Sequence, residues 1–134
     1  MAESDVPKEE IKKFVRKDLG CTCPDEVFDA ISVVHNPVEF SDFNKGYLLA
    51  IGGKLLVYLV VTHDWSSLKD GLEQIFRRGR EKRDAGGFNR FRLVVVTSDI
   101  QSARQILLRQ FNMLGELDER LHLHIVTPDQ VPQL

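Results

Sequence analysis

The stretch YLLAIGGKLLVYLVVT, residues 47–62, decides the fold of this chain. Two apolar runs flank Gly52 and Gly53, and paired glycines between such runs are typical of a two-residue β-hairpin. Residues 55–61 show no alternation with polar residues, which predicts a strand covered on both faces. We therefore expect the hairpin to lie within a sheet that has helices on each side.

The segment before the hairpin is helical in its pattern. Apolar residues recur at helical spacing up to Gly20, which is placed to end the helix in a left-handed conformation. Pro24 favours the start of a second, short helix. The pattern then changes, and residues 31–38 predict a first strand that ends near Asn36-Pro37.

The segment after the hairpin alternates between helix and strand. Helical periodicity covers 66–83 and 100–114, with Gly115 as the expected end of the second of these helices. Strands are expected at 92–97 and 121–127. Because helices connect the last three strands, we expect those strands to be parallel. The predicted fold is a single α/β domain with a mixed five-stranded sheet, with the N-terminal helices on one side and the two long helices on the other.

This order of elements resembles the core of the PD-(D/E)XK nucleases, which is a likeness of fold alone. Members of that family hold a metal ion with carboxylates and a lysine on their second and third strands. Residues 47–51 and 55–61 contain no acidic residue. We therefore do not predict a nuclease.

The composition is that of one globular domain, residues 1–134, with 43% hydrophobic and 28% charged residues. A net charge of −2 gives no overall attraction to nucleic acid or to an anionic membrane. We find no secretory signal and no apolar segment long enough to cross a bilayer, so we expect a soluble, cytoplasmic protein. Nucleotide-binding loops and the nucleophile-elbow and HExxH motifs are absent, and the sequence leaves the identity of any cofactor unknown.

Three predicted strands end in the same Thr-x-Asp turn. The residues are Thr62, Thr97 and Thr127, each followed two positions later by Asp64, Asp99 and Asp129. The carboxyl ends of parallel strands share one edge, where open α/β sheets usually bind ligands, so a cation or a phosphate is one interpretation. Helix capping is the other interpretation, and we favour it because it explains the residue types without a ligand. The capping groups are then Ser98 with Gln101, Thr127 with Gln130, and Asp64 ahead of the helix near Trp65.

Positive charge is concentrated in residues 77–92. Its members are Arg77, Arg78, Arg80, Lys82, Arg83, Arg90 and Arg92. One interpretation is a patch for nucleic acid or an acidic partner, with Phe88 or Phe91 available to stack on a base. The other is the solvated end of a helix followed by a Gly-Gly loop. We favour the second because the whole chain is slightly acidic, and we do not expect nucleic acid as a partner.

Histidines form a weaker pattern. His122 and His124 alternate on a predicted strand, so both rings face one side and are able to flank a metal ion. His35 and His63 lie at strand ends. No third ligand is fixed by spacing, so we favour a polar strand face over a metal site, and we predict no metal.

The two cysteines, Cys21 and Cys23, offer the clearest chemistry. Pro24 pushes Cys23 toward an extended backbone, which predicts that Cys23 caps the second helix and that its thiolate is stabilised there. Cys21 is then its partner in thiol exchange or metal binding, and a Cys-x-Cys disulfide closes a tight ring. The alternative is that Cys21 packs on the helix as a small apolar residue.

Three functions remain open on this basis. The first is an accessory protein in which Cys21 and Cys23 carry out thiol redox chemistry or bind a metal. The second is a non-catalytic interaction module that uses the basic segment or a sheet edge to bind another protein or a second copy of the chain. The third is a site for a small ligand or cation at the Thr-x-Asp turns. The sequence does not decide whether the protein is an enzyme.

Overall fold

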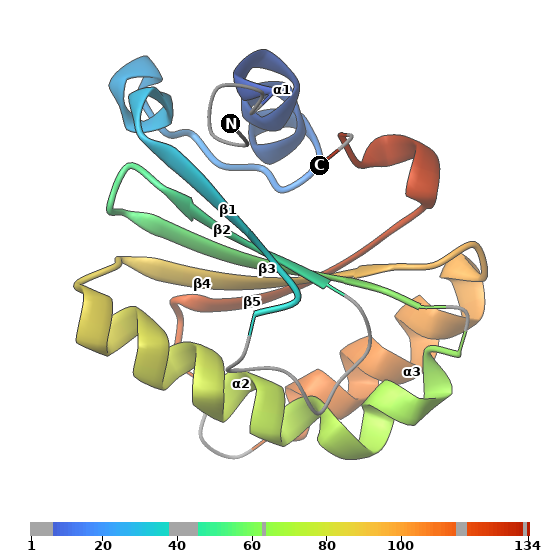
Figure 1. Cartoon of the computed structure of the whole chain (residues 1–134). Coiled ribbons are helices and arrows are strands. Elements are labelled where there is room, and N and C mark those ends of the chain that lie inside the picture. The colour runs from blue at the N-terminus through green and yellow to red at the C-terminus, as the bar shows by residue number, and fades with distance from the viewer. Residues whose placement is uncertain (1–6, 38–45, 63, 115–117, 133) are drawn as a thin grey trace.

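The computed structural model describes residues 7–37, 46–62, 64–114, 118–132 and 134 (Figure 1). The strands of its sheet are β1 (Ile31–His35), β2 (Gly46–Ile51), β3 (Leu55–Val61), β4 (Arg90–Val96) and β5 (Leu121–Val126). The α-helices of the described residues are α1 (Lys8–Lys17), α2 (Ser66–Gly86) and α3 (Ile100–Asn112). Short 3₁₀ helices follow α1 and β5, namely η2 (Asp25–Asp29) and η4 (Pro128–Gln130).

The sheet has the strand order β1-β2-β3-β4-β5. Strand β2 is antiparallel to both of its neighbours, β1 and β3, whereas β3, β4 and β5 are parallel. The predicted mixed five-stranded sheet is confirmed. The first strand is shorter than predicted because Asn36 has a φ of 50°, which breaks the extended backbone after His35. Residue 38, the expected end of that strand, lies outside the described residues.

The hairpin has Gly52 and Gly53 at its tip, with φ angles of 61° and 66° that suit glycine. Three residues connect the paired ends of β2 and β3, where two were predicted. The additional residue is Lys54, whose carbonyl oxygen accepts hydrogen bonds from the backbone N–H groups of Asn89 and Arg90 at 2.7 and 3.2 Å. The tip of the hairpin is therefore bonded to the start of β4.

Helices cover both faces of the sheet (Figure 1). The cluster of buried side chains under α2 and α3 includes Leu72, Phe91 and Leu107, and a second cluster under α1 and η2 includes Phe14 and Phe28. Every residue of β3 except the last is buried, as its apolar sequence predicts. The predicted placement of the N-terminal helices opposite the two long helices is confirmed.

Helix α2 continues to Gly86, three residues beyond the expected end. In this last part of α2, the guanidinium of Arg83 donates two hydrogen bonds of 3.0 Å to the carboxylate of Asp118. Gly87, with a φ of 72°, then ends the helix. The predicted end of α3 at Gly115 lies outside the described residues, and α3 is described to Asn112.

Candidate functional site

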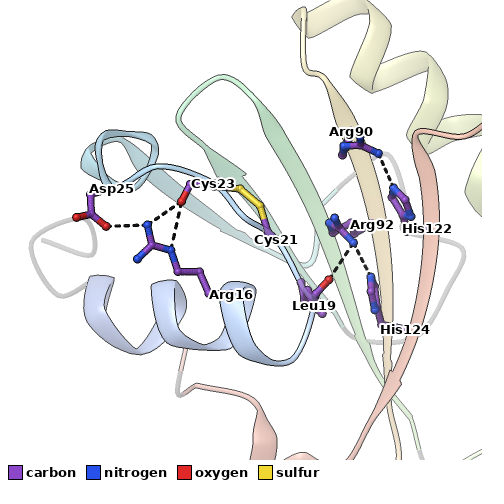
Figure 2. The surroundings of a disulfide bond; sticks show 9 residues. All are labelled: Arg16, Leu19, Cys21, Cys23, Asp25, Arg90, Arg92, His122 and His124. Atoms are coloured by element: carbon purple, nitrogen blue, oxygen red, sulfur yellow. Dashed lines mark hydrogen bonds and ion pairs between the residues drawn. A yellow bond between two sulfur atoms is a disulfide. The ribbon is translucent and has the colours of Figure 1, made fainter.

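A loop between α1 and η2 carries the two cysteines, whose sulfur atoms are joined as a disulfide (Figure 2). The Cα atoms of Cys21 and Cys23 lie 5.4 Å apart. Gly20 has the predicted left-handed conformation, with a φ of 71°, and the N–H of Cys21 returns to the carbonyl of Val15 at 3.1 Å. Both cysteines are half-buried and pack against the core cluster beneath α1.

Cys23 does not cap the second helix, so that prediction is wrong. Pro24 itself occupies the capping position, with φ of −67° and ψ of 161°, and η2 begins one residue later than expected. Because the extended conformation falls on Pro24, no side-chain hydrogen bond caps η2, which is a five-residue 3₁₀ helix. The sulfur of Cys23 instead bonds to Cys21.

Two arginines hold the cysteine loop at its ends (Figure 2). Arg16 of α1 donates from Nε and Nη2 to the carbonyl oxygen of Cys23 at 3.2 and 2.7 Å. Arg92 of β4 donates from Nη1 to the carbonyl oxygen of Leu19 at 3.1 Å. The role of Arg16 is not evident from the sequence, because a cation in the last turn of a helix is adequately explained by the helix dipole.

Arg90 and Arg92 pair with the two histidines of β5 on the α1 face of the sheet (Figure 2). Nη1 of Arg90 lies 2.9 Å from Nε2 of His122, and Nη1 of Arg92 lies 2.9 Å from Nε2 of His124. Since a guanidinium only donates, each Nε2 accepts and each ring is neutral. Burial, reinforced by the positive charge of Arg92, lowers the pKa of both histidines to about 4.

The prediction that His122 and His124 share one strand face is confirmed, with ring centroids 6.4 Å apart. They face arginines, and among the described residues no group of three or more His, Cys, Asp or Glu side chains is placed to hold a metal ion. His35 packs edge-on against Tyr47 at 4.9 Å between centroids. His63 lies outside the described residues.

Arg92 is an unusual residue for the interior of a sheet, since only 7% of it is exposed. Burial lowers the pKa of its guanidinium, and the neighbouring charge of Arg90 lowers it further. Within the described part of the chain no carboxylate bonds to Arg92, and its buried Nε has no hydrogen-bond partner. Unpaired buried polar atoms are rare, so this one calls for an explanation.

A pocket of about 570 Å³ opens between the cysteine loop and the starts of β3 and β4. Cys21 and Cys23 line one part of it, and Lys54, Arg90 and Arg92 line another. No acidic residue is among its lining residues in the described chain. The structure thus places the disulfide and three cations around one open cavity.

Each of the Thr-x-Asp turns forms a local side-chain hydrogen bond. Thr62 Oγ1 accepts from the N–H of Asp64 at 3.0 Å, and Thr97 Oγ1 accepts from the N–H of Asp99 at 3.3 Å. The third turn is different: Gln130 accepts from the N–H of Thr127 at 2.9 Å, which confirms the capping box predicted there.

The other two capping predictions are wrong. Asp99, rather than Ser98, precedes α3, and its side chain makes no capping bond. Trp65 occupies the position before α2, also without a side-chain cap. The carboxylate of Asp64 accepts instead from the Ser66 hydroxyl, and that of Asp99 from the indole N–H of Trp65 at 3.0 Å. Since both carboxylates already have local partners, the turns are explained without a ligand.

The basic segment is divided by the fold. Arg83 is 2% exposed and paired with Asp118, and Arg92 is buried under α1 on the opposite face of the sheet from α2. Arg77 pairs with Glu73 one turn away along α2. Of the two aromatic residues offered for stacking on a base, Phe91 is fully buried against α2 and is not available, whereas Phe88 is half-buried. Arg78, Arg80 and Lys82 also belong to α2, whereas Arg90 belongs to β4.

Comparison with protein-family models, with curated proteins and with solved structures finds no match for this chain. Among the described residues, no helix is both long and apolar enough to cross a membrane.

Proposed function

We propose that this protein exchanges electrons with small thiols through the Cys21–Cys23 pair. The observation that carries the proposal is the position of the disulfide, which lines an open pocket together with Lys54, Arg90 and Arg92. Cations near a sulfur stabilise its thiolate, and the thiolate is both the attacking and the leaving group in exchange. A disulfide that only contributes to packing does not require an open pocket or neighbouring cations.

The reaction has two steps. A thiolate from a first thiol attacks one sulfur of the disulfide, which forms a mixed disulfide and releases the other cysteine as a thiolate. A second thiol, as its thiolate, then attacks the small-molecule sulfur of the mixed disulfide. The two small molecules leave joined by a disulfide, and two electrons have passed to Cys21 and Cys23, whose thiolates take protons from water.

The rate of reduction tests this proposal. The full chain, purified without reductant, is incubated with dithiothreitol for increasing times, and free thiols are alkylated and counted by mass spectrometry. The matched control is the same protein unfolded in urea. We expect the folded protein to be reduced faster than the unfolded one, because the pocket attracts the attacking thiolate and stabilises the leaving thiolate.

A protected structural disulfide gives the opposite order, with the folded protein reduced more slowly than the unfolded one. That result would overturn the proposal. Single Cys21→Ser and Cys23→Ser variants then identify the sulfur that forms the mixed disulfide, since only the variant that retains the attacked sulfur keeps a reactive thiol in the folded state.

A further inference from the structure

The pocket beside the disulfide has an uncompensated positive charge. Its lining includes Lys54, Arg90 and Arg92 and, in the described chain, no acid. The acid nearest to the cysteines in sequence, Asp25, is already bound by Arg16 at 2.7 Å and by Lys12 at 3.2 Å. The hydrogen bond from Arg16 is also the main reason why the pKa of Asp25 lies below its usual value. Asp25 therefore does not neutralise the pocket.

Arg92 supplies the second observation. Its Nη1 is occupied by His124 and by the Leu19 carbonyl, whereas its buried Nε has no partner in the described part of the chain. The unoccupied side of this guanidinium is therefore the edge formed by Nε and Nη2. That edge carries two parallel N–H groups, and its best partner is a planar carboxylate that accepts both hydrogen bonds.

A ligand anion explains both observations together. A buried guanidinium whose Nε has no hydrogen-bond partner is costly in the free protein, and an anion that accepts from this edge would remove that cost. Lys54 is exposed at the rim, where a flexible cation attracts an anion without fixing its geometry. The pocket volume of about 570 Å³ is suited to a small molecule.

We propose that this pocket binds the carboxylate of a small thiol-bearing organic acid against Arg92 and so brings its thiol to the Cys21–Cys23 disulfide. The inference rests on the proposed thiol exchange, to which it adds the substrate class. The carboxylate is the binding group, and the thiol is the reacting group in the two steps given above.

A comparison of two thiols, one with a carboxylate and one without, tests the substrate class. Reduction of the disulfide in the full chain is timed with mercaptopropionate and with mercaptoethanol, each supplied at the same thiolate concentration. We expect mercaptopropionate to react about tenfold faster, the effect of one charge-assisted hydrogen-bonded pair. Arg92→Gln and Lys54→Ala lower this preference, whereas the rate with mercaptoethanol changes less. Arg109→Ala, which removes an exposed cation from α3, is the matched control and keeps the preference.

Folding of each variant is checked by circular dichroism. If Arg92→Gln does not fold, Lys54→Ala carries the test, because its side chain is exposed and supports no other contact in the described residues. Equal rates with the two thiols in the wild-type protein would overturn the inference while leaving thiol exchange in place. Loss of the preference in Arg109→Ala would also overturn it, since the effect would then be one of net charge.

A direct binding measurement separates the two proposals. Propionate, propionamide and inorganic phosphate are titrated into a variant with both cysteines changed to serine, and the arginine side-chain N–H signals are followed by NMR. Saturable shifts with propionate but not with propionamide support the carboxylate site even if the thiol exchange experiment fails. Saturable shifts with phosphate and none with propionate would overturn the carboxylate assignment.

Discussion

Acidification below neutral pH will destabilise the protein through His124. Its imidazole accepts a hydrogen bond from Arg92, and burial lowers its pKa from 6.5 to about 4. Because the unfolded state then binds the proton more readily, the stabilisation is complete above pH 6.5 and is lost progressively as the pH falls toward 4. A shift of this size corresponds to about 3 kcal/mol, of which about 2 kcal/mol is lost by pH 5. His122 adds a smaller amount because its ring is more open to solvent.

Urea unfolding at pH 7.5, 6 and 5 measures this loss, with the disulfide kept oxidised throughout. His124→Gln is the matched control, since an amide oxygen accepts from the guanidinium but does not titrate. We expect the variant to lose about 2 kcal/mol less than the wild-type protein between pH 7.5 and 5. Asp25 and Asp118 have lowered pKa values and titrate at more acidic pH, so they do not contribute to the loss of stability between pH 7.5 and 5. Equal losses in both proteins would refute the reasoning.

Three further substitutions test the packing, each by the free energy of unfolding in urea. Gly79→Ala places a Cβ against the aromatic ring of Phe91, and we expect a loss of about 1–3 kcal/mol from overpacking; unchanged stability would contradict that contact. Asp118→Asn leaves the buried guanidinium of Arg83 without its main carboxylate. Because solvent screens the pair and Asp84 remains as a partner, we expect a loss of only about 2 kcal/mol. Gly20→Ala meets no neighbouring atom, so its expected cost of about 1 kcal/mol comes from the left-handed backbone alone; a stabilised variant would contradict this account.

The fold was predictable because its decisive signals are local. Gly52-Gly53 between two apolar runs, and two helices of crossover length after β3, leave few ways to arrange a mixed sheet. Boundaries were less predictable where tertiary contacts decide them. Helix α2 continues past Arg83 to Gly86, and Arg83 pairs with Asp118, 35 positions away, a contact that no local pattern reports.

The candidate site was only partly predictable. Cys21 and Cys23 were identified from sequence, but the roles of Arg16 and Arg92 depend on which carbonyls the folded loop presents to them. The sequence assigns Arg92 to a basic surface segment because six other cations precede it within residues 77–92. Its burial follows from strand alternation, which turns residues 90 and 92 toward α1 and Phe91 toward α2.

The candidate site also lies at the opposite edge of the sheet from the one that the Thr-x-Asp turns suggested. At the carboxyl edge, the turn residues bond to one another, so Asp64 and Asp99 already have partners. At the amino edge, β4 begins with two arginines that face away from α2. Among the described residues they bond only to two histidines and to the backbone carbonyls of Glu119 and Leu19. The unsatisfied charge is therefore at the amino edge, and the cysteine loop crosses the sheet there. The usual rule for ligand sites in α/β sheets depends on helix N-termini after the strands, whereas here arginines at the strand starts supply the positive charge.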